Sequence, residues 1–559
     1  VCPFYHPVYK EKILKKHALL IASAFLFSCI TASCDKNDEK EGGENYMFNL
    51  CLLGNPKSLD PQFANDESSN TVIANLYSGL LKMDESGAIL CDNAESYTIS
   101  PDGKSYTFKL RQDNYWFIDK NKNDKADEGE YFNVTANDYV FAFERLLNPE
   151  TQSPFAESFI CIEGASDRLN GSSDSVSGVT AADDYTLIIN LDYANANFLN
   201  LMTSQAVMPC NEEFFYSTKG RYGLDDKSVM SNGSFFMRQW FYDPYGKNNI
   251  LYMKPNAVNS ENDEVYPSYL NFDIEKKQSD IITSFKKGDT ECFTSMNFDS
   301  SFNKNKYYYK ASRSLTLGLI FNPDDKTYSN KSLQKAIAYS INKAELEKEL
   351  NNDLKAAYGL IPDDIRLLGR SYRELCSDKD MDIYNKSTAL DCLEQAKSQL
   401  KVESFNSVRI LVSTDTINSE YIHLLSQQWQ ETLGFYIGVD EVSDEEFYSR
   451  LNTGDYSIAL YPITANYNSG VSFLDSFSDN PYFKISDDNI HAVKQLDHIS
   501  NSSDYVKSFK DIEQKILNEC CFVPVFYKNT YLVMKKENED ILYDAFSKSV
   551  NYQYAKHYD

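Results

Sequence analysis

A twelve-residue stretch from Asp119 to Glu130 carries oxygen side chains at the spacing of a calcium loop. Ca²⁺ takes six to eight oxygen ligands at about 2.3–2.6 Å, and ligands at loop positions one, three, five, nine and twelve can surround one point. At position seven Lys125 would add its backbone carbonyl. The other five positions hold Asp119, Asn121, Asn123, Asp127 and Glu130. The sequence therefore predicts a structural Ca²⁺ site.

Two features of this stretch favour the alternative, a charged hairpin without a metal. Asp124 stands at position six, where calcium loops use a glycine for a sharp turn. The preceding residues, Tyr115 to Ile118, read as a strand rather than a helix. Both interpretations stay open from the sequence.

Catalytic motifs are scarce in the chain of 559 residues. It has six histidines and contains no Gly-x-Ser-x-Gly, no His-Glu-x-x-His and no glycine-rich phosphate loop. Scattered carboxylates could still serve a cell-surface hydrolase, which stays as an alternative. The formal net charge of −27 repels phosphate backbones. We predict a protein that is not an enzyme, requires no cofactor and binds no nucleic acid.

The N-terminal segment has the pattern of an export signal. A basic stretch, Lys10 to Lys16, precedes the apolar run Ala18 to Ile30, which is short for a bilayer span but suits a signal peptide. Thr-Ala-Ser-Cys then ends at Cys34 and resembles a bacterial lipobox, although Thr31 departs from the usual Leu. We predict a signal peptide over 1–34, acylation of Cys34 and a flexible tether over 35–45. The protein is then exported and lipid-anchored to the outer face of the cell membrane.

Helices and strands alternate in the second half of the chain. Strands are expected at 317–321, 408–412, 435–439 and 456–461, and helices along 333–341, 420–433 and 444–451. This alternation predicts a mainly parallel sheet covered by helices, in which ligands bind beyond the carboxyl ends of the strands. The loop Pro462 to Gly470 is therefore a candidate ligand loop.

Two helices are expected in the first half. Val72, Leu76 and Leu80 lie four residues apart and predict one amphipathic helix. Tyr139 to Leu147 predicts another, which starts at Thr135 with a capping box completed by Asp138.

Seven segments in order carry a family resemblance along nearly all of the mature chain. They are Gly54–Pro61 (GNPKSLDP), Asn75–Leu81 (NLYSGLL), Ser100–Leu110, Val134–Arg145, Asn232–Trp240, Phe321–Leu346 and Asp455–Phe473. Together they resemble the extracellular solute-binding proteins of the oligopeptide/dipeptide/nickel class, family 5, which serve ABC importers.

The resemblance implies an α/β, two-lobed, periplasmic-binding-protein-like fold of type II that closes on its ligand like a flytrap, with an additional inserted domain. The domains it implies are a discontinuous lobe I (46–80, 182–320 and 528–559), an inserted domain (81–181) and a β/α lobe III (321–527). It further implies a monomer that captures a short peptide and delivers it to the permease subunits of an ABC importer.

The resemblance also places the ligand. In peptide-binding relatives the peptide lies extended between the lobes, which implies contacts from Ile463, Thr464, Ala465, Asn466 and Tyr467. In those relatives the loop reads Ala-Asp-Tyr, and the Asp pairs with the α-ammonium group of the ligand. Here Asn466 replaces that Asp and cannot neutralise an ammonium group.

Two explanations of Asn466 stay open. A nearby carboxylate compensates, and the other implied peptide-contacting segment offers Asn65, Asp66 and Glu67. Otherwise the ligand lacks a free amino terminus, and the same fold binds another solute, such as a nickel chelate, haem, a sugar or a pheromone. A sensor or adhesin that kept the fold and lost transport is a further alternative.

Overall fold

The computed structural model describes residues 43–84, 87–245, 249–297, 305–405, 408–465, 467–478, 480–499 and 501–558. The predicted signal peptide, Cys34, most of the tether and Asn466 lie outside these residues. Among the described helices none combines the length and apolarity that a membrane span requires.

Lobe I is built on a four-stranded sheet in the order β1-β12-β11-β10. Its strands are β1 (Met47–Leu53), β12 (Tyr269–Glu275), β11 (Ile250–Pro255) and β10 (Phe235–Phe241). The first pair is parallel and the other two are antiparallel. Along β1 the side chains of Phe48, Leu50 and Leu52 are buried and their neighbours are more exposed, the period of two expected for a strand with one covered face.

The inserted domain has its own antiparallel sheet in the order β4-β5-β9-β8. The strands are β4 (Ala94–Ile99), β5 (Ser105–Leu110), β9 (Thr186–Asn190) and β8 (Val179–Asp183). The boundary expected after residue 181 lies inside β8, and β9 follows it in the same sheet. Phe108 of this sheet and Phe48 of lobe I belong to one continuous hydrophobic core. The two units therefore pack as one body.

The β/α lobe contains the larger sheet, in the order β13-β21-β14-β20-β18-β19. The strands are β13 (Cys292–Ser295), β21 (Phe522–Lys535), β14 (Tyr307–Phe321), β20 (Ile458–Ile463), β18 (Val408–Ser413) and β19 (Ile437–Val442), with β15 (Leu354–Ala356) beside β21. β18 is parallel to β19 and β20, whereas β14 is antiparallel to β20 and β21. The sheet is therefore mixed rather than mainly parallel.

Helices cover both faces of this sheet, as the alternation of buried residues requires. Ile410 and Val412 pack on the side of α7 (Lys331–Tyr339), α11 (Lys386–Leu400) and α12 (Glu420–Leu433). Leu411, between them, packs with α13 (Asp444–Thr453), α14 (Gly470–Ser478), α15 (Asp487–Gln495) and α16 (Ser502–Glu519). α12 has the predicted bounds, and β19 and β20 begin two residues later than predicted.

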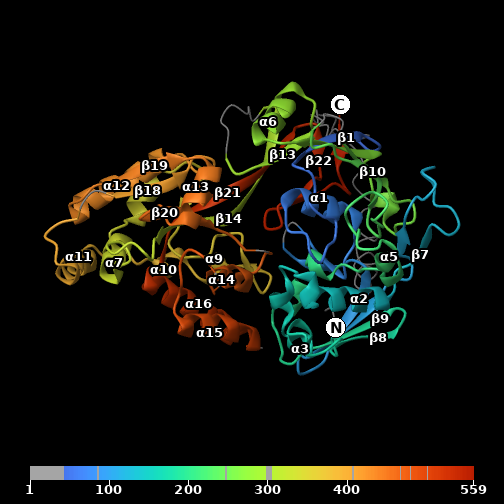
Figure 1. The fold of residues 1–559 in the computed structure, drawn as a ribbon, viewed down its shortest axis with the longest axis horizontal. Helices are drawn as coiled ribbons and strands as arrows, with labels where there is room; N and C mark the ends of the chain where they lie inside the picture. The colour runs from blue at the N-terminus through green and yellow to red at the C-terminus, as the bar shows by residue number, and fades with distance from the viewer. Residues whose placement is uncertain are drawn as a thin grey trace, which may run out of the picture.

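Two long strands, β14 and β21, run between the lobes (Figure 1). The β21 residues Leu532 and Met534 pack into the lobe I core, whereas Val523 and Val525 pack into the β/α lobe. The β14–β21 pairing shifts register between Ser312 and Leu315. The boundary expected after residue 320 therefore falls inside a strand, and the packing changes from one lobe to the other near residue 313.

The helix predicted around Val72 is α1 (Glu67–Leu76), which starts earlier than expected and ends before Leu80. Its end has a tertiary cause, because the Leu76 carbonyl accepts the N–H of Gly233 at 2.8 Å instead of a bond from the next turn. Leu80 is still fully buried in the core. The second predicted helix, α2 (Ala136–Leu146), has the expected capping box between Thr135 and Asp138.

The other elements are short and connect these units. The helices are α3 (Ala165–Leu169), α4 (Phe198–Leu201), α5 (Glu212–Ser217), α6 (Gln278–Lys287), α8 (Lys343–Leu346), α9 (Tyr372–Leu375) and α10 (Asp378–Met381). The paired strands are β2 (Leu81–Met83) with β3 (Ile89–Cys91), β6 (Tyr115–Phe117) with β7 (Tyr131–Asn133), β16 (Arg366–Leu367) with β17 (Arg370–Ser371), β22 (Asn538–Glu539) with β25 (Lys556–His557), and β23 (Leu542–Asp544) with β24 (Ser549–Asn551).

Candidate ligand-binding cleft

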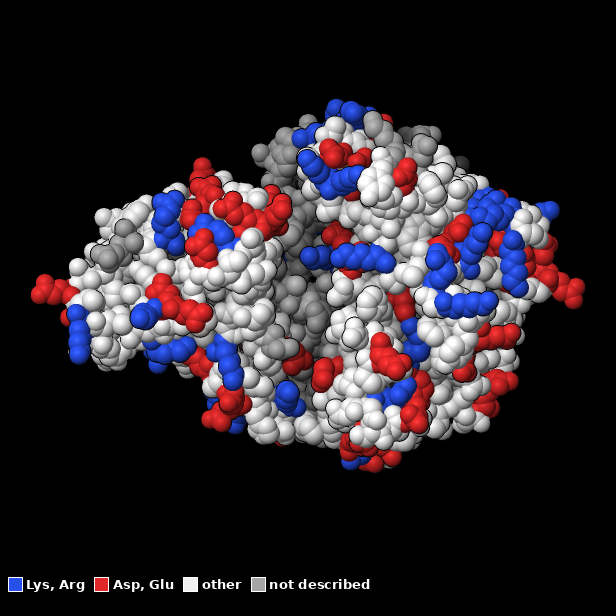
Figure 2. All heavy atoms as spheres, viewed as in Figure 1, with Lys and Arg blue, Asp and Glu red and all other residues white. Residues whose placement is uncertain are grey.

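A cleft of about 970 Å³ lies between the lobes, at the upper end of the usual size of ligand sites. Lobe I lines it with the start of α1 and the β23–β24 hairpin, and the β/α lobe with residues 310–312 of β14 and the segments 364–366 and 464–468. Figure 2 shows the molecular surface hollowed between the two lobes. The site therefore depends on both lobes.

The predicted ligand loop after β20 forms part of the β/α wall. Thr464, Ala465 and Tyr467 line the cleft, whereas the Ile463 side chain is buried in the core of its own lobe. Asn466 lies outside the described residues. The Thr464 hydroxyl donates to the Ser314 carbonyl at 3.1 Å, which ties the loop to the crossing strand β14. Of the predicted contact residues of this loop that the structure describes, all but Ile463 thus line the cleft.

A second segment of the β/α wall, Asp364 to Arg366, was not expected from the sequence. The Arg366 N–H donates to Oδ1 of Asn468 at 2.9 Å, so this segment lies directly beside the predicted loop. The Arg313 N–H donates to Oδ2 of Asp364 at 2.6 Å. Pro362-Asp363-Asp364 gives an ordinary loop signal in the sequence, but its place beside the loop 464–468 arises from tertiary packing.

Beneath that segment lies a buried polar network centred on Glu513 of α16. Glu513, whose side chain is 0% exposed, accepts the Leu360 N–H at 2.8 Å and the Ile361 N–H at 3.2 Å. It also accepts the Tyr372 hydroxyl and the Arg373 guanidinium, each at 2.6 Å. These bonds satisfy a buried carboxylate and fix the chain just before Asp364.

The lobe I wall contains the predicted residues Asn65, Asp66 and Glu67, and all three line the cleft. Asp66 is the N-cap of α1, with its two oxygens accepting the N–H and the hydroxyl of Ser69 at 3.1 and 2.7 Å. Glu67 accepts the Thr294 hydroxyl, and burial raises the pKa of its carboxyl group despite that bond. Both carboxylates are therefore engaged by other residues of the protein.

A further charged group of this wall was not predicted. Lys82 lies 3.4 Å from a carboxylate oxygen of Asp92 and 3.1 Å from one of Glu261. The Gly79 N–H donates to the second oxygen of Asp92 at 3.0 Å. Burial raises the pKa of Asp92 against the opposing effect of Lys82. Lys82 and Asp92 line the cleft as a pair.

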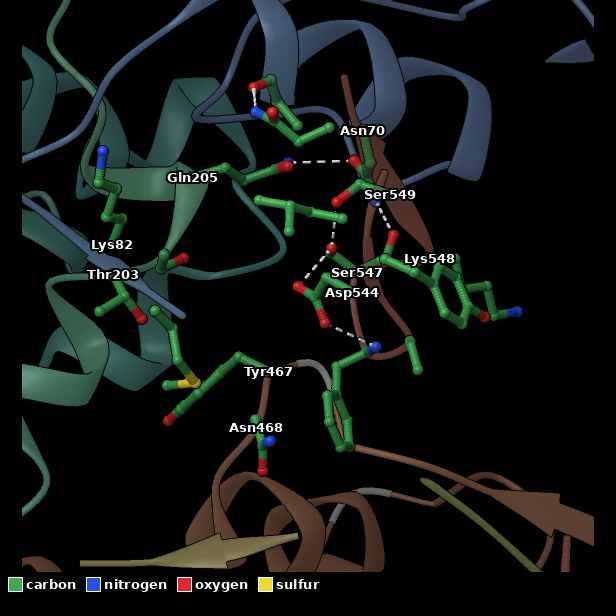
Figure 3. A pocket seen from close by; sticks show the side chains of 18 of the residues that line it. Asn70, Lys82, Thr203, Gln205, Tyr467, Asn468, Asp544, Ser547, Lys548 and Ser549 are labelled. Atoms are coloured by element: carbon green, nitrogen blue, oxygen red, sulfur yellow. Dashed lines mark hydrogen bonds between the residues drawn. The ribbon is translucent and has the colours of Figure 1, made fainter. Parts of the chain in front are cut away.

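The C-terminal hairpin β23–β24 completes the lobe I wall. Asp544 accepts the Phe546 N–H at 2.9 Å and the Ser547 hydroxyl at 2.6 Å. The Asn70 amide of α1 donates to the Ser547 carbonyl at 2.8 Å and accepts from Gln205 at 3.1 Å (Figure 3). In the same view Tyr467 and Asn468 approach from the β/α lobe. No sequence spacing links these segments, which are dozens to hundreds of residues apart.

Three further contacts join the two lobes. The Asn200 amide donates to the Asn468 carbonyl at 2.9 Å. The rings of Tyr193 and His498 stack with centroids 3.6 Å apart. Arg366 packs on the backbone of Gly87, where an added Cβ would lie 2.0 Å from the guanidinium Nε. The lobes are therefore in contact around the cleft.

The predicted calcium residues lie elsewhere, on the loop between β6 and β7. Glu130 accepts the N–H groups of Lys120 and Asn121 at 2.9 and 3.2 Å, and Asp127 accepts the side-chain amides of Asn121 and Asn123, each at 2.7 Å. Asp124 takes the left-handed φ of 63° in place of a glycine. Within the described ranges no group of three or more His, Cys, Asp and Glu is placed to hold a metal ion.

Comparison with known proteins agrees with this geometry. Residues 91–484 match the family model of bacterial extracellular solute-binding proteins, family 5 (middle). The oligopeptide-binding protein OppA of Bacillus subtilis is 23% identical over 93% of this chain and 96% of its own, and the dipeptide-binding protein DppE of the same organism is 20% identical over 95% and 97%. Among solved structures, the pheromone receptor PrgZ aligns with a TM-score of 0.70 at 23% identity over 92% of this chain and all of its own. Listeria monocytogenes OppA bound to peptide aligns with a TM-score of 0.69 at 21% identity over 92% and 99%.

Proposed function

The chain belongs to the bacterial extracellular solute-binding proteins of family 5, and on that premise we propose that it captures short peptides in the cleft between its lobes. The captured peptide is handed to the permease of an ABC importer. The family is one of binding proteins, and the proposal contains no catalytic step.

The observation that carries the proposal is the composition of the cleft. Its walls present hydroxyl and amide groups from both lobes, including Asn70, Gln205 and Thr464, together with charges of both signs. Every peptide offers the same main-chain N–H and C=O groups, so polar walls of this kind support affinity that depends little on side-chain sequence. A volume of about 970 Å³ leaves room for water to fill the space around side chains of different size.

The test is calorimetric titration of the full chain with pools of three- to five-residue peptides, alongside mass spectrometry of small molecules released from the native protein. We expect binding of peptide pools in the micromolar range or tighter and release of peptides from the native protein. Release of a nickel chelate, haem or a sugar, without binding of any peptide pool, would replace the peptide proposal by one of the other solutes.

The proposal includes export and anchoring through a lipid on Cys34, which rest on the sequence pattern of residues 10–34. Mass spectrometry of the membrane-extracted protein is expected to show cleavage before Cys34 and an acylated thiol. Retention of an unlipidated Cys34→Ser protein on the membrane would contradict this part of the proposal.

Calcium binding by the loop 119–130 also stays a proposal. The left-handed Asp124 and the convergence of Asn121, Asn123 and Asp127 support it, because they give the loop a compact turn lined with oxygen-bearing side chains. Added Ca²⁺ is expected to raise Tm in the wild type and to leave the Tm of Glu130→Gln unchanged. Equal Tm with and without Ca²⁺ in the wild type contradicts it.

A further inference from the structure

We infer that Asp364, on the β/α wall, is the carboxylate that receives the free ammonium group of a bound peptide. The inference rests on the proposed function and names the chemistry of the ligand end that the cleft selects. The structure adds this residue to a site for which the sequence offered Asn65, Asp66 and Glu67 as candidates.

Asp364 lies beside the predicted ligand loop. Asp364 lines the cleft, and Arg366 of the same segment donates its N–H to the side chain of Asn468. The Arg313 N–H, which Asp364 accepts, belongs to β14 next to Ser314, and Ser314 in turn accepts the hydroxyl of Thr464. Asp364 therefore shares one corner of the cleft with the predicted ligand loop.

The carboxylate of Asp364 is held in place by a backbone group and not by a cation. Oδ2 of Asp364 accepts the Arg313 N–H at 2.6 Å, which orients the group without neutralising it. The nearby cations are directed elsewhere: Arg313 and Lys355 pair with Asp363 at 2.8 and 3.0 Å. In the part of the chain that the structure describes, Asp364 takes part in no ion pair. A carboxylate that is partly buried and lacks a cation gains most from a ligand that brings one.

The other carboxylates of the described cleft differ from Asp364 in their partners or their position; they are Asp66, Glu67, Asp84, Asp92 and Asp544. Asp66 caps a helix, Asp92 pairs with Lys82, and Asp544 closes the β23–β24 turn. Glu67 is held by Thr294 in surroundings that raise its pKa and so disfavour its charged form. Asp84 accepts the Ala88 N–H at 2.9 Å within the β2–β3 hairpin. All five lie on lobe I or the inserted domain, opposite the predicted loop.

Two cations line the same cleft as Asp364. Lys310 donates to the Ile541 carbonyl at 2.7 Å, and Arg366 donates to the Gly369 carbonyl at 3.3 Å while packing on Gly87. Arg366 lines the cleft two residues from Asp364, so a second positive charge on the peptide next to its amino terminus meets repulsion there. The site therefore favours a single ammonium group followed by an uncharged residue.

The experiment compares free and N-acetylated forms of the same three- to five-residue peptides by calorimetry with wild type, Asp364→Asn and Asp511→Asn. Asp511 is an exposed residue of α16, and its substitution changes the net charge by the same amount. Wild type and Asp511→Asn are expected to prefer the free peptides by about tenfold or more, and Asp364→Asn to lose that preference. The preference of the wild type is also expected to fall above about pH 8, where peptide amino groups lose their proton.

The possible results distinguish a failure of the role of Asp364 from a failure of the proposed function. A wild type that binds free peptides better, with Asp364→Asn keeping the same preference, overturns the role of Asp364 and leaves the peptide function standing. A wild type that binds neither form overturns the proposed function itself. If Asp364→Asn fails to fold, as judged by circular dichroism, Asp364→Glu provides the test, since it keeps the charge but displaces the carboxylate by one methylene group and is expected to lose part or all of the preference. An Asp364→Glu protein without any preference, beside a wild type that has one, supports the role of Asp364. Full preference after this displacement of the carboxylate overturns it.

Discussion

On the wall opposite the β/α lobe, Asp66, Asp92 and Asp544 each bind partners from lobe I or the inserted domain, whereas on the β/α wall Asp364 accepts one backbone N–H and forms no ion pair with a described residue. Aspartates therefore have two different roles in the cleft. Carboxylates that cap a helix or close a turn build the wall, and a carboxylate held in place but not neutralised is available to a ligand. The comparison teaches that the number of acidic residues in a cleft says little about which of them recognises a charge.

The supports of the two walls differ as well. The lobe I wall is held by many single hydrogen bonds between segments such as Asn70, Gln205 and Ser547. The β/α wall before Asp364 depends on one buried residue, Glu513, which accepts four hydrogen bonds. Loss of one bond on lobe I is therefore expected to matter less than loss of Glu513.

The largest effect is expected from Glu513→Gln. The change removes the charge that pairs with the buried Arg373 and leaves its guanidinium uncompensated, which costs about 3–5 kcal/mol. The segment that carries Asp364 loses its anchor at the same time. Thermal unfolding is expected to show a Tm lowered by several degrees, and calorimetry a weaker affinity for peptides.

Glu345→Gln is the matched control, since Glu345 forms an exposed ion pair with Lys348 at 2.8 Å and both side chains are more than half exposed. Its effect on the free energy of unfolding is expected to stay below about 0.5 kcal/mol. Equal Tm values for the two variants would show that the β/α wall does not depend on Glu513.

The next largest effect is expected when the carboxylate of the β/α wall is moved from position 364 to position 466. Adding Asn466→Asp to Asp364→Asn restores a carboxylate at the position that the family resemblance assigns to ammonium binding, between Ala465 and Tyr467, which both line the cleft. We expect the double variant to regain most of a tenfold loss in affinity for free peptides. Calorimetry with the acetylated peptides is the control, because no gain is expected there. A double variant as weak as Asp364→Asn would place the ligand's amino terminus away from this loop.

A smaller effect is expected from the contact between the walls. Asn200→Ala removes the hydrogen bond to the Asn468 carbonyl, and a neutral hydrogen bond of this kind contributes about 0.5–1.5 kcal/mol. If the contact belongs to the closed form, peptide dissociation accelerates by about two- to tenfold while the association rate changes little. Stopped-flow measurement of both rates tests this, and an unchanged dissociation rate would remove Asn200 from the closure contacts.

The smallest effect on binding is expected from Glu67→Gln. The glutamine can still accept the Thr294 hydroxyl, so peptide affinity is expected to change less than about twofold. Stability should respond instead. Because burial raises the pKa of Glu67 in the folded chain, its contribution is complete below the ordinary glutamate value and is lost as pH rises through the raised one. As the pH rises above the ordinary glutamate pKa of about 4.3, the wild type therefore loses more unfolding free energy than Glu67→Gln does. If the unfolding free energies of the two proteins depend equally on pH, or if peptide affinity changes tenfold, Glu67 becomes a candidate ligand carboxylate again.

The sequence by itself determined the local elements and one wall of the site. The period of 3.6 residues gave α12 its bounds, and the pair Thr135 and Asp138 identified the start of α2. The alternation of strands and helices predicted a candidate ligand loop after β20, and residues of that loop line the cleft. These features depend on residues that are close together in the chain, so the spacing of residue types is enough to predict them.

Tertiary structure alone decided the rest. The end of α1 at Leu76 depends on Gly233, the lobe I wall needs the hairpin of residues 542–551, and Asp364 reaches the ligand loop through Arg313 and Asn468. Each of these contacts joins segments that are dozens to hundreds of residues apart. Whether a carboxylate is bonded within the protein or available to a ligand depends on which distant segments pack against it. The spacing of residues in the sequence does not show which segments these are.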